Sequence, residues 1–483
     1  MKLKALLNHL HISAKIEEDL MITGITSHSK KVKPGYLFFA ISGVQKDGHQ
    51  YIQEAFQNGA LAVFGEYPNA QNNDLYFYAE DTKRLLSRAA SYYYGEPYKK
   101  HKMTGITGTN GKTTTSFLLQ HILVSHGITS SLFGTVHHYI NSSIINSSHT
   151  TPDPVTLQKM LNESQDEAVV MEVSSHGLEQ KRIEGITYDQ AIFLNLTHDH
   201  LDYHGTMESY FQCKAKLFTY IKPKGTAIIC SEGTYGKRLI TDLSSKNNLQ
   251  VWTYGKRKTD HFYIEDVGKN FFNLVHETLQ VTVPLPLPGE YNAMNTTAAI
   301  AAALDYGIPI KSSVAYLSSF HGIPGRFEEM MLFNGTEVII DYAHTPDGVL
   351  QVLEAARKKA ESRPFFHVFG FRGKRDLSKR TEMISLSLEY SDHTILTVDD
   401  LNGITQEQLI EETKEAIPVR ANSPTIIADR TEAIFYALKK APPKSVVIIT
   451  GKGPESYKET YRYGTDSDLS TVEYFQSLNQ AVL

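Results

Sequence analysis

The chain has 483 residues, of which 41% are hydrophobic and 21% charged, and it contains only two cysteines. At roughly 150 residues per domain, this length predicts about three domains, and Cys213 and Cys230 are too few for a disulfide framework or a sulfur-ligated zinc site. The formal net charge of −5 excludes a global positive field that would attract nucleic acid or an anionic membrane. Any anionic substrate must therefore be held by local cations and backbone amides.

The apolar segments are too short to insert into a membrane. Residues 1–10 (MKLKALLNHL) lack the apolar core of a signal peptide. The longest apolar run, Ala298–Leu304, falls far below the ~20 residues that span a bilayer. We therefore expect a cytoplasmic protein that binds no nucleic acid and does not insert into a membrane, and we expect it to act as a monomer.

Up to about residue 100, short apolar runs alternate with helical patterns. Residues 36–41 and 60–64 have the composition of strands, whereas residues 50–57 and 82–93 have helical periodicity. This alternation predicts a small α/β unit. The segment Gly95–Lys102, with a proline and a basic run, is then predicted to be a linker.

From Met103 the pattern becomes strand, glycine-rich turn and helix, with a helix predicted over Thr113–Ser125. Buried strands are predicted at Ala168–Val173 and Ala191–Leu196, and each ends in a polar cluster. Because ligands of open α/β sheets bind beyond the carboxyl ends of the strands, these clusters are candidate site residues. A strand at Glu337–Asp341 begins the last α/β region. We therefore predict an α/β protein with domains at 1–100, 101–325 and 326–483.

The segment Thr107–Thr114 reads TGTNGKTT, which has the character of a phosphate-binding loop. The eight-residue form of this loop requires glycine where the chain has Ile106, but the shorter form Gly108-x-x-Gly111-Lys112-Thr113 is present. Backbone amides and the following helix N-terminus bind phosphate, the lysine neutralises its oxygens, and the threonine hydroxyl can ligate Mg²⁺. The sequence therefore predicts nucleoside triphosphate binding, with a functionless glycine-rich turn as the alternative.

Acidic and imidazole groups follow the next two predicted strands. Glu172 ends the first, and His198, His200 and His204 follow the second. Such groups can complete the shell of a divalent cation that bridges phosphates. Each histidine alone is more simply a solvated side chain, but their occurrence with Glu172 favours a metal site. Lys214 alone has the pattern of a solvated helix lysine, although a buried lysine can react with carbon dioxide to form an anionic carbamate.

Eight motifs follow one another along the chain: TGTNGKTT, HTTPDP (149–154), MEVSSHGLEQKR (171–182), NLTHDHLDYHGTMESY (195–210), GEYNAMN (289–295), GIPGRFE (322–328), DYAHTPDGV (341–349) and GKGPESY (451–457). Their order and spacing resemble those of the Mur ligases, and above all the members that extend UDP-N-acetylmuramoyl-L-alanyl-D-glutamate in peptidoglycan synthesis. The resemblance implies an N-terminal domain for the UDP-sugar, a central ATPase-like domain with a parallel sheet and a C-terminal Rossmann-like domain for the amino acid.

The resemblance also implies a reaction. The glutamate γ-carboxylate attacks the γ-phosphate of ATP to give an acyl phosphate, and the amine of a diamino acid then displaces phosphate through a tetrahedral intermediate. This order is chemically reasonable because a carboxylate is a poor acyl donor until one oxygen becomes a phosphate leaving group. Cations must surround both anions during the transfer.

The resemblance further assigns roles to individual residues. Those implied for ATP are Thr107, Gly108, Thr109, Asn110, Gly111, Lys112, Thr113, Asn292, Arg326 and Asp341. Those implied for magnesium are Thr113, Glu172, His200 and Lys214, of which Lys214 resembles the family's carbamylated lysine (N6-carboxylysine). Lys112, Glu172, His200 and Lys214 are the implied catalytic set. Ser29, Thr150, Thr151, Ser174, Gln180 and Arg182 resemble contacts to the UDP-dipeptide, and Arg380, Asp399, Asp400, Asn402, Gly451 and Glu455 resemble contacts to the amino acid.

Two departures from the family pattern bear on the substrates. His28-Ser29-Lys30 stands where the family usually has Asp-Ser-Arg, and lysine neutralises a phosphate without the arginine fork, unless this is neutral drift in an exposed loop. Pro454 stands where the family has histidine.

Arg380 ends a basic run that begins at Arg372, and such a run is usually a solvated face. We favour a function for it because it follows a predicted buried strand, Phe365–Phe369.

The third departure concerns the amino acid. Members that add meso-diaminopimelate carry Asp-Asn-Pro-Arg, whereas this chain reads Asp399-Asp400-Leu401-Asn402. A distal carboxylate would lose its arginine and face an added anion, while a lysine ammonium would gain a partner. The sequence therefore predicts lysine, or a related basic amino acid, over diaminopimelate.

Other functions remain open on the sequence alone. One is an amide ligase with another acceptor or amine, such as a folylpolyglutamate synthetase, a specialised-metabolite ligase or a paralogue of the cell-wall enzyme. The spacing of HTTPDP and GEYNAMN argues against the folylpolyglutamate synthetase. Another is a non-catalytic module that uses ATP as a conformational switch, which would not need Lys214, Arg380 and Glu455 to match.

Overall fold

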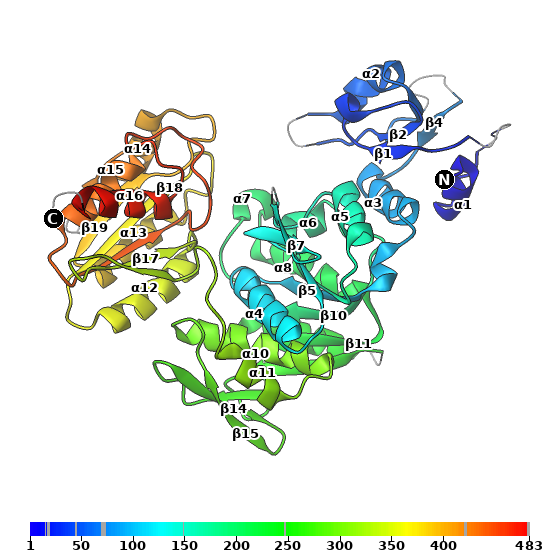
Figure 1. Cartoon of the computed structure of the whole chain (residues 1–483). Helices are drawn as coiled ribbons and strands as arrows, with labels where there is room; N and C mark the ends of the chain where they lie inside the picture. Colours follow the sequence, from blue (N-terminus) through cyan, green and yellow to red (C-terminus); the bar gives the residue numbers. More distant parts are fainter. Residues whose placement is uncertain are drawn as a thin grey trace.

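The computed structural model describes residues 1–14, 16, 20–43, 46–68, 74–147, 149–245, 248–419 and 423–480, with only the backbone described at 479–480. Three sheets follow one another along the chain, with strands at 24–78, 102–284 and 328–450 (Figure 1). The predicted α/β class with three parts is confirmed. The boundaries near residues 100 and 325 remain our proposal.

The N-terminal part is a four-stranded parallel sheet in the order β1-β2-β3-β4. Its elements are α1 (Leu3–His9), β1 (Gly24–Thr26), η1 (Ser29–Lys31), β2 (Tyr36–Phe39), η2 (Gly48–Tyr51), α2 (Ile52–Gln57), β3 (Ala60–Gly65), β4 (Tyr76–Tyr78) and α3 (Thr82–Tyr93). Helix α3 has the predicted bounds, and it begins where the Asp81 carboxylate accepts a hydrogen bond from the Arg84 amide at 3.0 Å.

The expected linker at 95–102 is not an extended segment. Pro97–Lys100 forms a short 3₁₀ helix, η3, in which Pro97 and Tyr98 are buried. Helix α3 is also tied to the central part, because Arg84 Nε lies 2.9 Å from Glu184 Oε1 and Lys181 pairs with Asp81. The apolar side chains in the segment therefore pack against neighbouring elements, which composition alone did not indicate.

The central part contains an eleven-stranded sheet in the order β15-β14-β13-β12-β11-β10-β5-β9-β6-β7-β8. Its strands are β5 (Lys102–Thr107), β6 (Ser130–Phe133), β7 (His137–Ile140), β8 (Ser143–Asn146), β9 (Ala168–Glu172), β10 (Tyr188–Phe193), β11 (Ile221–Cys230), β12 (Gln250–Gly255), β13 (Phe262–Glu265), β14 (Phe271–His276) and β15 (Leu279–Pro284). Its helices are α4 (Lys112–Ser125), α5 (Pro154–Glu163), α6 (Ser175–Glu179), α7 (Leu201–His204), α8 (Met207–Ala215), η4 (Lys216–Tyr220), α9 (Gly233–Ser244), α10 (Glu290–Asp305) and α11 (Ile310–Leu317).

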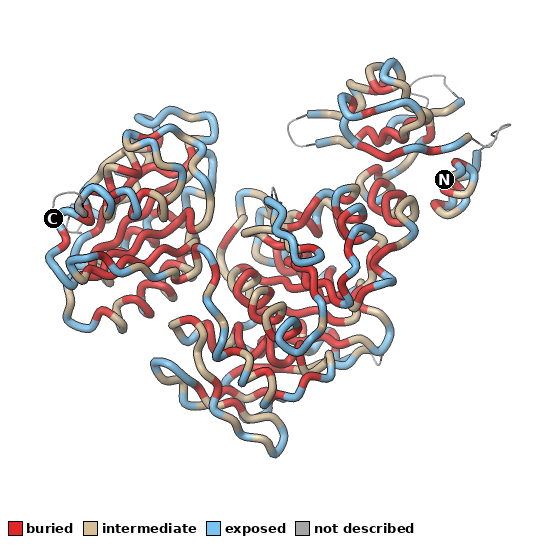
Figure 2. Tube along the Cα trace, viewed as in Figure 1, coloured by how far each residue is buried: buried red, intermediate tan, exposed pale blue. Residues whose placement is uncertain are grey.

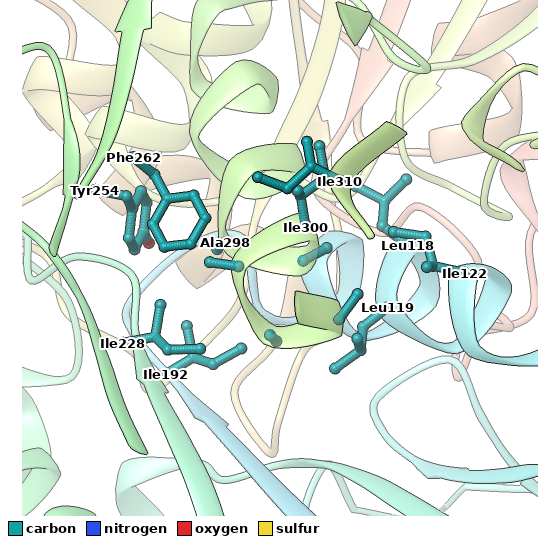
Figure 3. Close-up of a cluster of buried hydrophobic side chains, with 14 of the residues drawn as sticks. Leu118, Leu119, Ile122, Ile192, Ile228, Tyr254, Phe262, Ala298, Ile300 and Ile310 are labelled. Carbon is teal, nitrogen blue, oxygen red and sulfur yellow. The ribbon is translucent and has the colours of Figure 1, made fainter. Parts of the chain in front are cut away.

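This sheet is parallel in its middle and antiparallel at its edges. Strands β6, β9, β5, β10, β11, β12 and β13 run parallel, whereas β7–β8 and β14–β15 are antiparallel hairpins. The expected parallel sheet is thus correct for the strands that carry the site. Helices α4, α10 and α11 cover one face, where Leu118, Ile122 and Ile300 join strand residues such as Ile192 and Ile228 in one core (Figure 3).

The C-terminal part has a six-stranded sheet in the order β16-β17-β21-β18-β19-β20, parallel except for β16. Its elements are β16 (Glu328–Met331), β17 (Glu337–Asp341), α12 (Pro346–Ala360), β18 (Phe365–Phe371), α13 (Arg380–Tyr390), β19 (His393–Val398), α14 (Gln406–Glu415), β20 (Thr425–Ile426), α15 (Arg430–Lys440), β21 (Val446–Thr450) and α16 (Asp468–Gln480). The predicted strand at Glu337–Asp341 has the observed bounds of β17.

The central strands of the two larger sheets, such as β5, β9, β18 and β21, are largely buried (Figure 2), whereas the edge strand β8 is exposed. Cys213 and Cys230 are buried and free. None of the helices within the described ranges is long and apolar enough to cross a membrane.

Candidate active site

A cavity of about 870 Å³ lies between the central and C-terminal parts, where the loops after β5, β9 and β10 meet those after β17 and β18. Most of the predicted site residues line it: Thr109, Asn110, Gly111, Lys112, Thr113, Thr150, Thr151, Glu172, Ser174, Gln180, Arg182, His200, Asn292, Arg326, Asp341, Arg380, Asp399 and Glu455. Ser29, Thr107, Gly108, Lys214, Asp400, Asn402 and Gly451 do not line it. One cavity therefore joins residues predicted for three different ligands.

The phosphate loop connects β5 to the N-terminus of α4. Gly111 has a φ of 88°, and a Cβ there would lie 2.3 Å from Asn295 Oδ1, so glycine is required. The Asn195 side chain braces the loop: its Oδ1 accepts hydrogen bonds from the amides of Thr109 (3.1 Å) and Asn110 (2.9 Å), and its Nδ2 donates to the Asn110 carbonyl (3.1 Å). We did not predict a role for Asn195, which lies in the predicted strand Ala191–Leu196 but follows the observed end of β10 at Phe193.

Two lysines bind carbonyl groups of this loop. Lys112 Nζ donates to the carbonyls of Gly108 (2.7 Å) and Thr109 (2.9 Å), and Lys214 Nζ donates to that of Gly108 (2.8 Å). Lys214 is 1% exposed and lies over the Tyr210 ring, which excludes the solvated-lysine interpretation. Burial lowers the pKa of both amines, that of Lys214 strongly. A buried amine shifted toward its neutral form has the reactivity that carbamate formation requires.

Glu172 stands fully buried at the end of β9, beside the phosphate loop. Its Oε2 accepts hydrogen bonds from the hydroxyls of Thr113 (3.0 Å) and Thr135 (2.9 Å), and its Oε1 accepts one from the Thr135 amide (3.0 Å). A carboxylate and a hydroxyl at hydrogen-bond distance next to a phosphate loop are the hard oxygen donors that suit Mg²⁺.

His200 lies on the same cavity with its Nε2 3.2 Å from Asp199 Oδ2. Burial lowers the pKa of His200 to about 3, so its imidazole is neutral and able to act as a ligand. Over the described part of the chain, no group of three or more His, Cys, Asp or Glu side chains is arranged to hold a metal ion by itself. A magnesium ion at this position would therefore take further ligands from phosphate and water, as this ion ordinarily does.

Four of the residues predicted for the UDP-dipeptide form one hydrogen-bonded cluster: Thr151, Ser174, Gln180 and Arg182. Thr151 Oγ1 lies 3.2 Å from Ser174 Oγ, and Arg182 Nη1 donates to the Thr151 carbonyl at 2.5 Å. Arg182 Nη2 also donates to Gln180 Oε1 at 2.7 Å, and Thr150 Oγ1 lies 3.0 Å from Thr135 Oγ1. This cluster places a guanidinium and several hydroxyls on the cavity wall. Ser29 lies in η1 of the N-terminal part, away from this cavity.

The residues predicted to bind the nucleotide but lying outside the phosphate loop, Asn292, Arg326 and Asp341, also line the cavity. Arg326 Nη2 donates to Thr113 Oγ1 at 3.0 Å, and its guanidinium stacks over the Tyr342 ring at 4.5 Å. The Asp341 carboxylate accepts hydrogen bonds from the amides of Phe327 and Ala343, both at 2.7 Å, and burial raises its pKa. Asn292 is buried at the start of α10, where its Nδ2 donates to the Pro288 carbonyl at 2.7 Å.

Further contacts join the two parts across the cavity. Asn110 Nδ2 donates to Asp347 Oδ2 at 2.8 Å, and Lys379 Nζ lies 3.4 Å from Asp199 Oδ1. His198 Nε2 lies 3.1 Å from Asp376 Oδ2, so this histidine faces the C-terminal part. These partners are distant in sequence, and no local pattern indicated them.

Gly451 and Glu455, which follow β21 and were predicted to bind the substrate amino acid, both contact Arg372. We had noted Arg372 only as the start of a basic run. Arg372 Nη2 donates to Glu455 Oε2 at 2.6 Å and to the Gly451 carbonyl at 3.3 Å, and Tyr342 Oη donates to Glu455 Oε1 at 2.7 Å. Arg380 is buried, with its Nη1 3.0 Å from Glu412 Oε2. Both predicted charged groups, Glu455 and Arg380, therefore already have partners of opposite charge.

Asp399 belongs to a buried ion network. Its Oδ1 accepts a hydrogen bond from Arg430 Nη1 at 2.5 Å, while the Nε and Nη2 of Arg430 bind Asp468, each at 2.7 Å. Burial raises the pKa of Asp399, and the charge of Arg430 opposes this shift.

Asp400 is not an unpaired anion. Its Oδ1 lies 2.8 Å from Lys452 Nζ and its Oδ2 lies 2.9 Å from Lys458 Nζ. Burial alone would raise the pKa of Asp400, but the two lysines outweigh it and lower the pKa to about 2. Asn402 donates from Nδ2 to the Gly373 carbonyl at 3.0 Å. The picture of Asp400 as a free partner for a substrate ammonium is thus wrong, because two lysines from the loop after β21 neutralise it.

Comparison with known proteins places these features in a family. The model of the Mur ligase family, catalytic domain, matches residues 21–94, the Mur ligase middle domain matches 106–303, and the Mur ligase, glutamate ligase domain matches 325–453. A UDP-N-acetylmuramoyl-L-alanyl-D-glutamate--2,6-diaminopimelate ligase of Aquifex aeolicus (strain VF5) is 40% identical over 444 residues, which cover 91% of this chain and 90% of the relative.

Two solved structures are similar over nearly their whole length. A UDP-N-acetylmuramoyl-L-alanyl-D-glutamate--2,6-diaminopimelate ligase has 28% sequence identity and a TM-score of 0.69, with 98% of this chain and 99% of that chain covered. The MurF ligase from Thermotoga maritima in complex with ADP shares the fold at 20% identity, with a TM-score of 0.66 and coverage of 96% and 100%.

Proposed function

Because this chain belongs to the Mur ligase family and is a ligase, we propose that it joins an amino group of a diamino acid to the γ-carboxylate of UDP-N-acetylmuramoyl-L-alanyl-D-glutamate, driven by ATP, in peptidoglycan synthesis. The observation that carries this proposal is the shared cavity. The phosphate loop, the Thr151–Ser174–Arg182 cluster and Glu455 all line it. The cavity therefore offers adjacent binding sites for a nucleotide, an anionic acceptor and an amine. A non-catalytic module that uses ATP as a conformational switch would not require all three.

In the first step, an oxygen of the glutamate γ-carboxylate attacks the γ-phosphorus of ATP. The bond from that phosphorus to the bridging oxygen breaks, so that ADP leaves and an acyl phosphate remains. The amides at the N-terminus of α4 donate hydrogen bonds to the phosphate oxygens, and Lys112 provides a positive charge for them. Arg182 on the cavity wall provides a cation for the acceptor, and Arg326, which contacts Thr113, provides one for the nucleotide.

Thr113, Glu172 and His200, together with Lys214 as its carbamate, are the residues that would hold magnesium. Bound there, the ion would neutralise the phosphate charge that accumulates during the transfer. The fit is supported by the direct Thr113–Glu172 contact and the neutral state of His200. Lys214 stands behind the loop, 2.8 Å from the Gly108 carbonyl, so its role depends on the carbamate extending the side chain.

In the second step, the amine attacks the acyl carbon to give a tetrahedral intermediate, which releases inorganic phosphate and leaves the amide. The amine must be neutral to attack, and the proton it loses passes to a base or to solvent. Glu455 lies on the cavity wall and supplies a carboxylate for the ammonium of the incoming amino acid. Arg380 is the cation that the resemblance implies for its carboxylate.

The identity of the diamino acid is the finer part of this proposal. The relatives above carry names of diaminopimelate ligases. The lysine preference expected from the sequence had two reasons, the acidic Asp400 and the neutral Asn402. The pairing of Asp400 with Lys452 and Lys458 removes the first reason, whereas the second remains.

Phosphate release from ATP tests the proposed function directly. Purified enzyme is incubated with UDP-N-acetylmuramoyl-L-alanyl-D-glutamate and, in separate reactions, with lysine, ornithine or meso-diaminopimelate. We expect release that requires both the acceptor and one of the amines, with the amide product confirmed by mass spectrometry. UDP-N-acetylmuramoyl-L-alanine, which lacks the glutamate, is the matched control. Release that is independent of acceptor and amine would exclude the ligase.

A further inference from the structure

Arg372 is the first residue after β18, and its guanidinium stands among the residues proposed to bind the amino acid. Its Nη2 contacts Glu455 and the Gly451 carbonyl, and its Nε lies 3.7 Å from Asp400 Oδ2. Arg372 also lines the cavity, whereas Asp400 and Asn402 do not. Arg372 therefore lies between the cavity and Asp400, one of the two residues on which the expected preference depended.

The guanidinium of Arg372 is only partly satisfied by the protein. Its Nη1 makes no hydrogen bond to a residue in the described ranges, and its Nε is buried without a hydrogen-bond partner there. Burial opposes the charge, but the acidic neighbours, with Glu455 the strongest of them, outweigh this effect and raise the pKa of Arg372, so the group is cationic. A cation with a free Nη1 beside a cavity is suited to an additional carboxylate oxygen.

The carboxylates around Arg372 are all paired within the protein. The cations Arg372, Lys452 and Lys458 contact the carboxylates of Asp400 and Glu455, and the neighbouring Asp399 is paired with Arg430. Each of these carboxylates therefore already has a cation as its partner. Lys452 is buried and Lys458 does not line the cavity, so Arg372 is the cation of this set that a ligand in the cavity can reach.

We propose that Arg372 is a specificity-determining residue that binds the second carboxylate of a dicarboxylic diamino acid, in place of the arginine that is missing at Asn402. This inference rests on the proposed function, and it favours meso-diaminopimelate over lysine, the reverse of the expectation from sequence. A carboxylate at this point gains a charge-assisted hydrogen bond, whereas the same region offers the terminal ammonium of lysine a guanidinium of like charge.

The ratio of kcat/KM for meso-diaminopimelate to that for lysine is the decisive quantity. We expect the wild-type enzyme to prefer meso-diaminopimelate and Arg372→Gln to lower the ratio by about tenfold or more, because a charge-assisted hydrogen bond is lost for one substrate only. Arg372→Lys keeps the charge without the fork and should fall between the two. Arg357→Gln is the matched control, since Arg357 binds Asp392 in the same domain at 3.2 Å, outside the cavity.

The outcomes separate the inference from the proposed function. A structural role for Arg372 would lower turnover of both amines alike, so an unchanged ratio in Arg372→Gln would overturn the inference, as would a wild-type preference for lysine. Absence of amine-dependent phosphate release in the wild type would instead refute the proposed function. Calorimetric titration of wild type and Arg372→Gln with meso-diaminopimelate and with lysine would then still decide the inference, because it measures binding without turnover.

Discussion

Replacement of Arg430 by methionine should destabilise the C-terminal part and, through Asp399, its side of the cavity. The Arg430 side chain is completely buried and contacts the Asp399 carboxylate, the Asp468 carboxylate and, at 3.0 Å, the Thr450 carbonyl. Methionine has a similar length and no charge. The variant therefore leaves two buried carboxylates and the carbonyl at the end of β21 without their cation.

Removal of one partner from a buried ion pair costs roughly 3–5 kcal/mol. For a unit of about 150 residues, each kcal/mol lowers the melting temperature by about 2–4 °C, so we expect a decrease of about 10 °C. Burial already raises the pKa of Asp399, and loss of Arg430 would raise it further. A raised pKa in the folded state adds stability below the pKa of the unfolded state that is lost as pH rises. The decrease should thus be smaller at pH 5 than at pH 8.

Scanning calorimetry at both pH values measures the effect, and hydrogen exchange of peptides from β18, β19 and β21 locates it, with β5 as the internal reference. The double variant Arg430→Met with Asp468→Asn should recover part of the loss, because one uncompensated carboxylate is removed. Arg462→Met is the matched control: its guanidinium pairs with Glu432 on the surface and is 68% exposed, so no measurable shift is expected. Equal melting temperatures of Arg430→Met and wild type at pH 8 would refute the reasoning.

Three further variants test the cavity. Lys214→Ala should lower phosphate release by about 100-fold and be partly rescued by propionate if a carbamate acts there; an equal loss in the control Lys216→Ala, which removes an exposed surface pair with Glu179, would contradict this. Tyr342→Phe should raise KM for the amine about tenfold while KM for ATP stays unchanged, because only the hydrogen bond to Glu455 is lost. The matched Tyr390→Phe, whose hydroxyl donates to Glu354 at 3.1 Å away from the cavity, should change neither, and a rise in both constants for Tyr342→Phe would count against the prediction. Gly111→Ala should abolish binding of a fluorescent ATP analogue, because its Cβ would lie 2.3 Å from Asn295 Oδ1. Gly127→Ala, with a φ of 93° but open space around it, should bind normally, and retained binding in Gly111→Ala would disprove the steric requirement.

Local rules were sufficient for several elements and for the phosphate loop. Helix α3 and strand β17 have their predicted bounds, because hydrophobic periodicity and turn residues act over a few positions. TGTNGKTT identified the loop because close approach to phosphate needs glycine, lysine and threonine at fixed spacing. The same rules misjudged residues 95–102, where burial of Tyr98 against distant elements outweighs a linker-like composition.

The amino-acid sequence by itself thus determined the α/β class, the phosphate loop and the family, all of which depend on short spacings. Only the tertiary structure decided which charges are free. From the sequence, Asp400 was expected to be an unpaired anion, but in the fold it pairs with Lys452 and Lys458. Asp399 likewise pairs with Arg430. The sequence showed Arg372 only as one member of a basic run. Because β18 pairs with β21, Arg372 lies beside Glu455 in the fold. Electrostatic partners are chosen by distance in space, and that distance is set by strand pairing rather than by position along the chain.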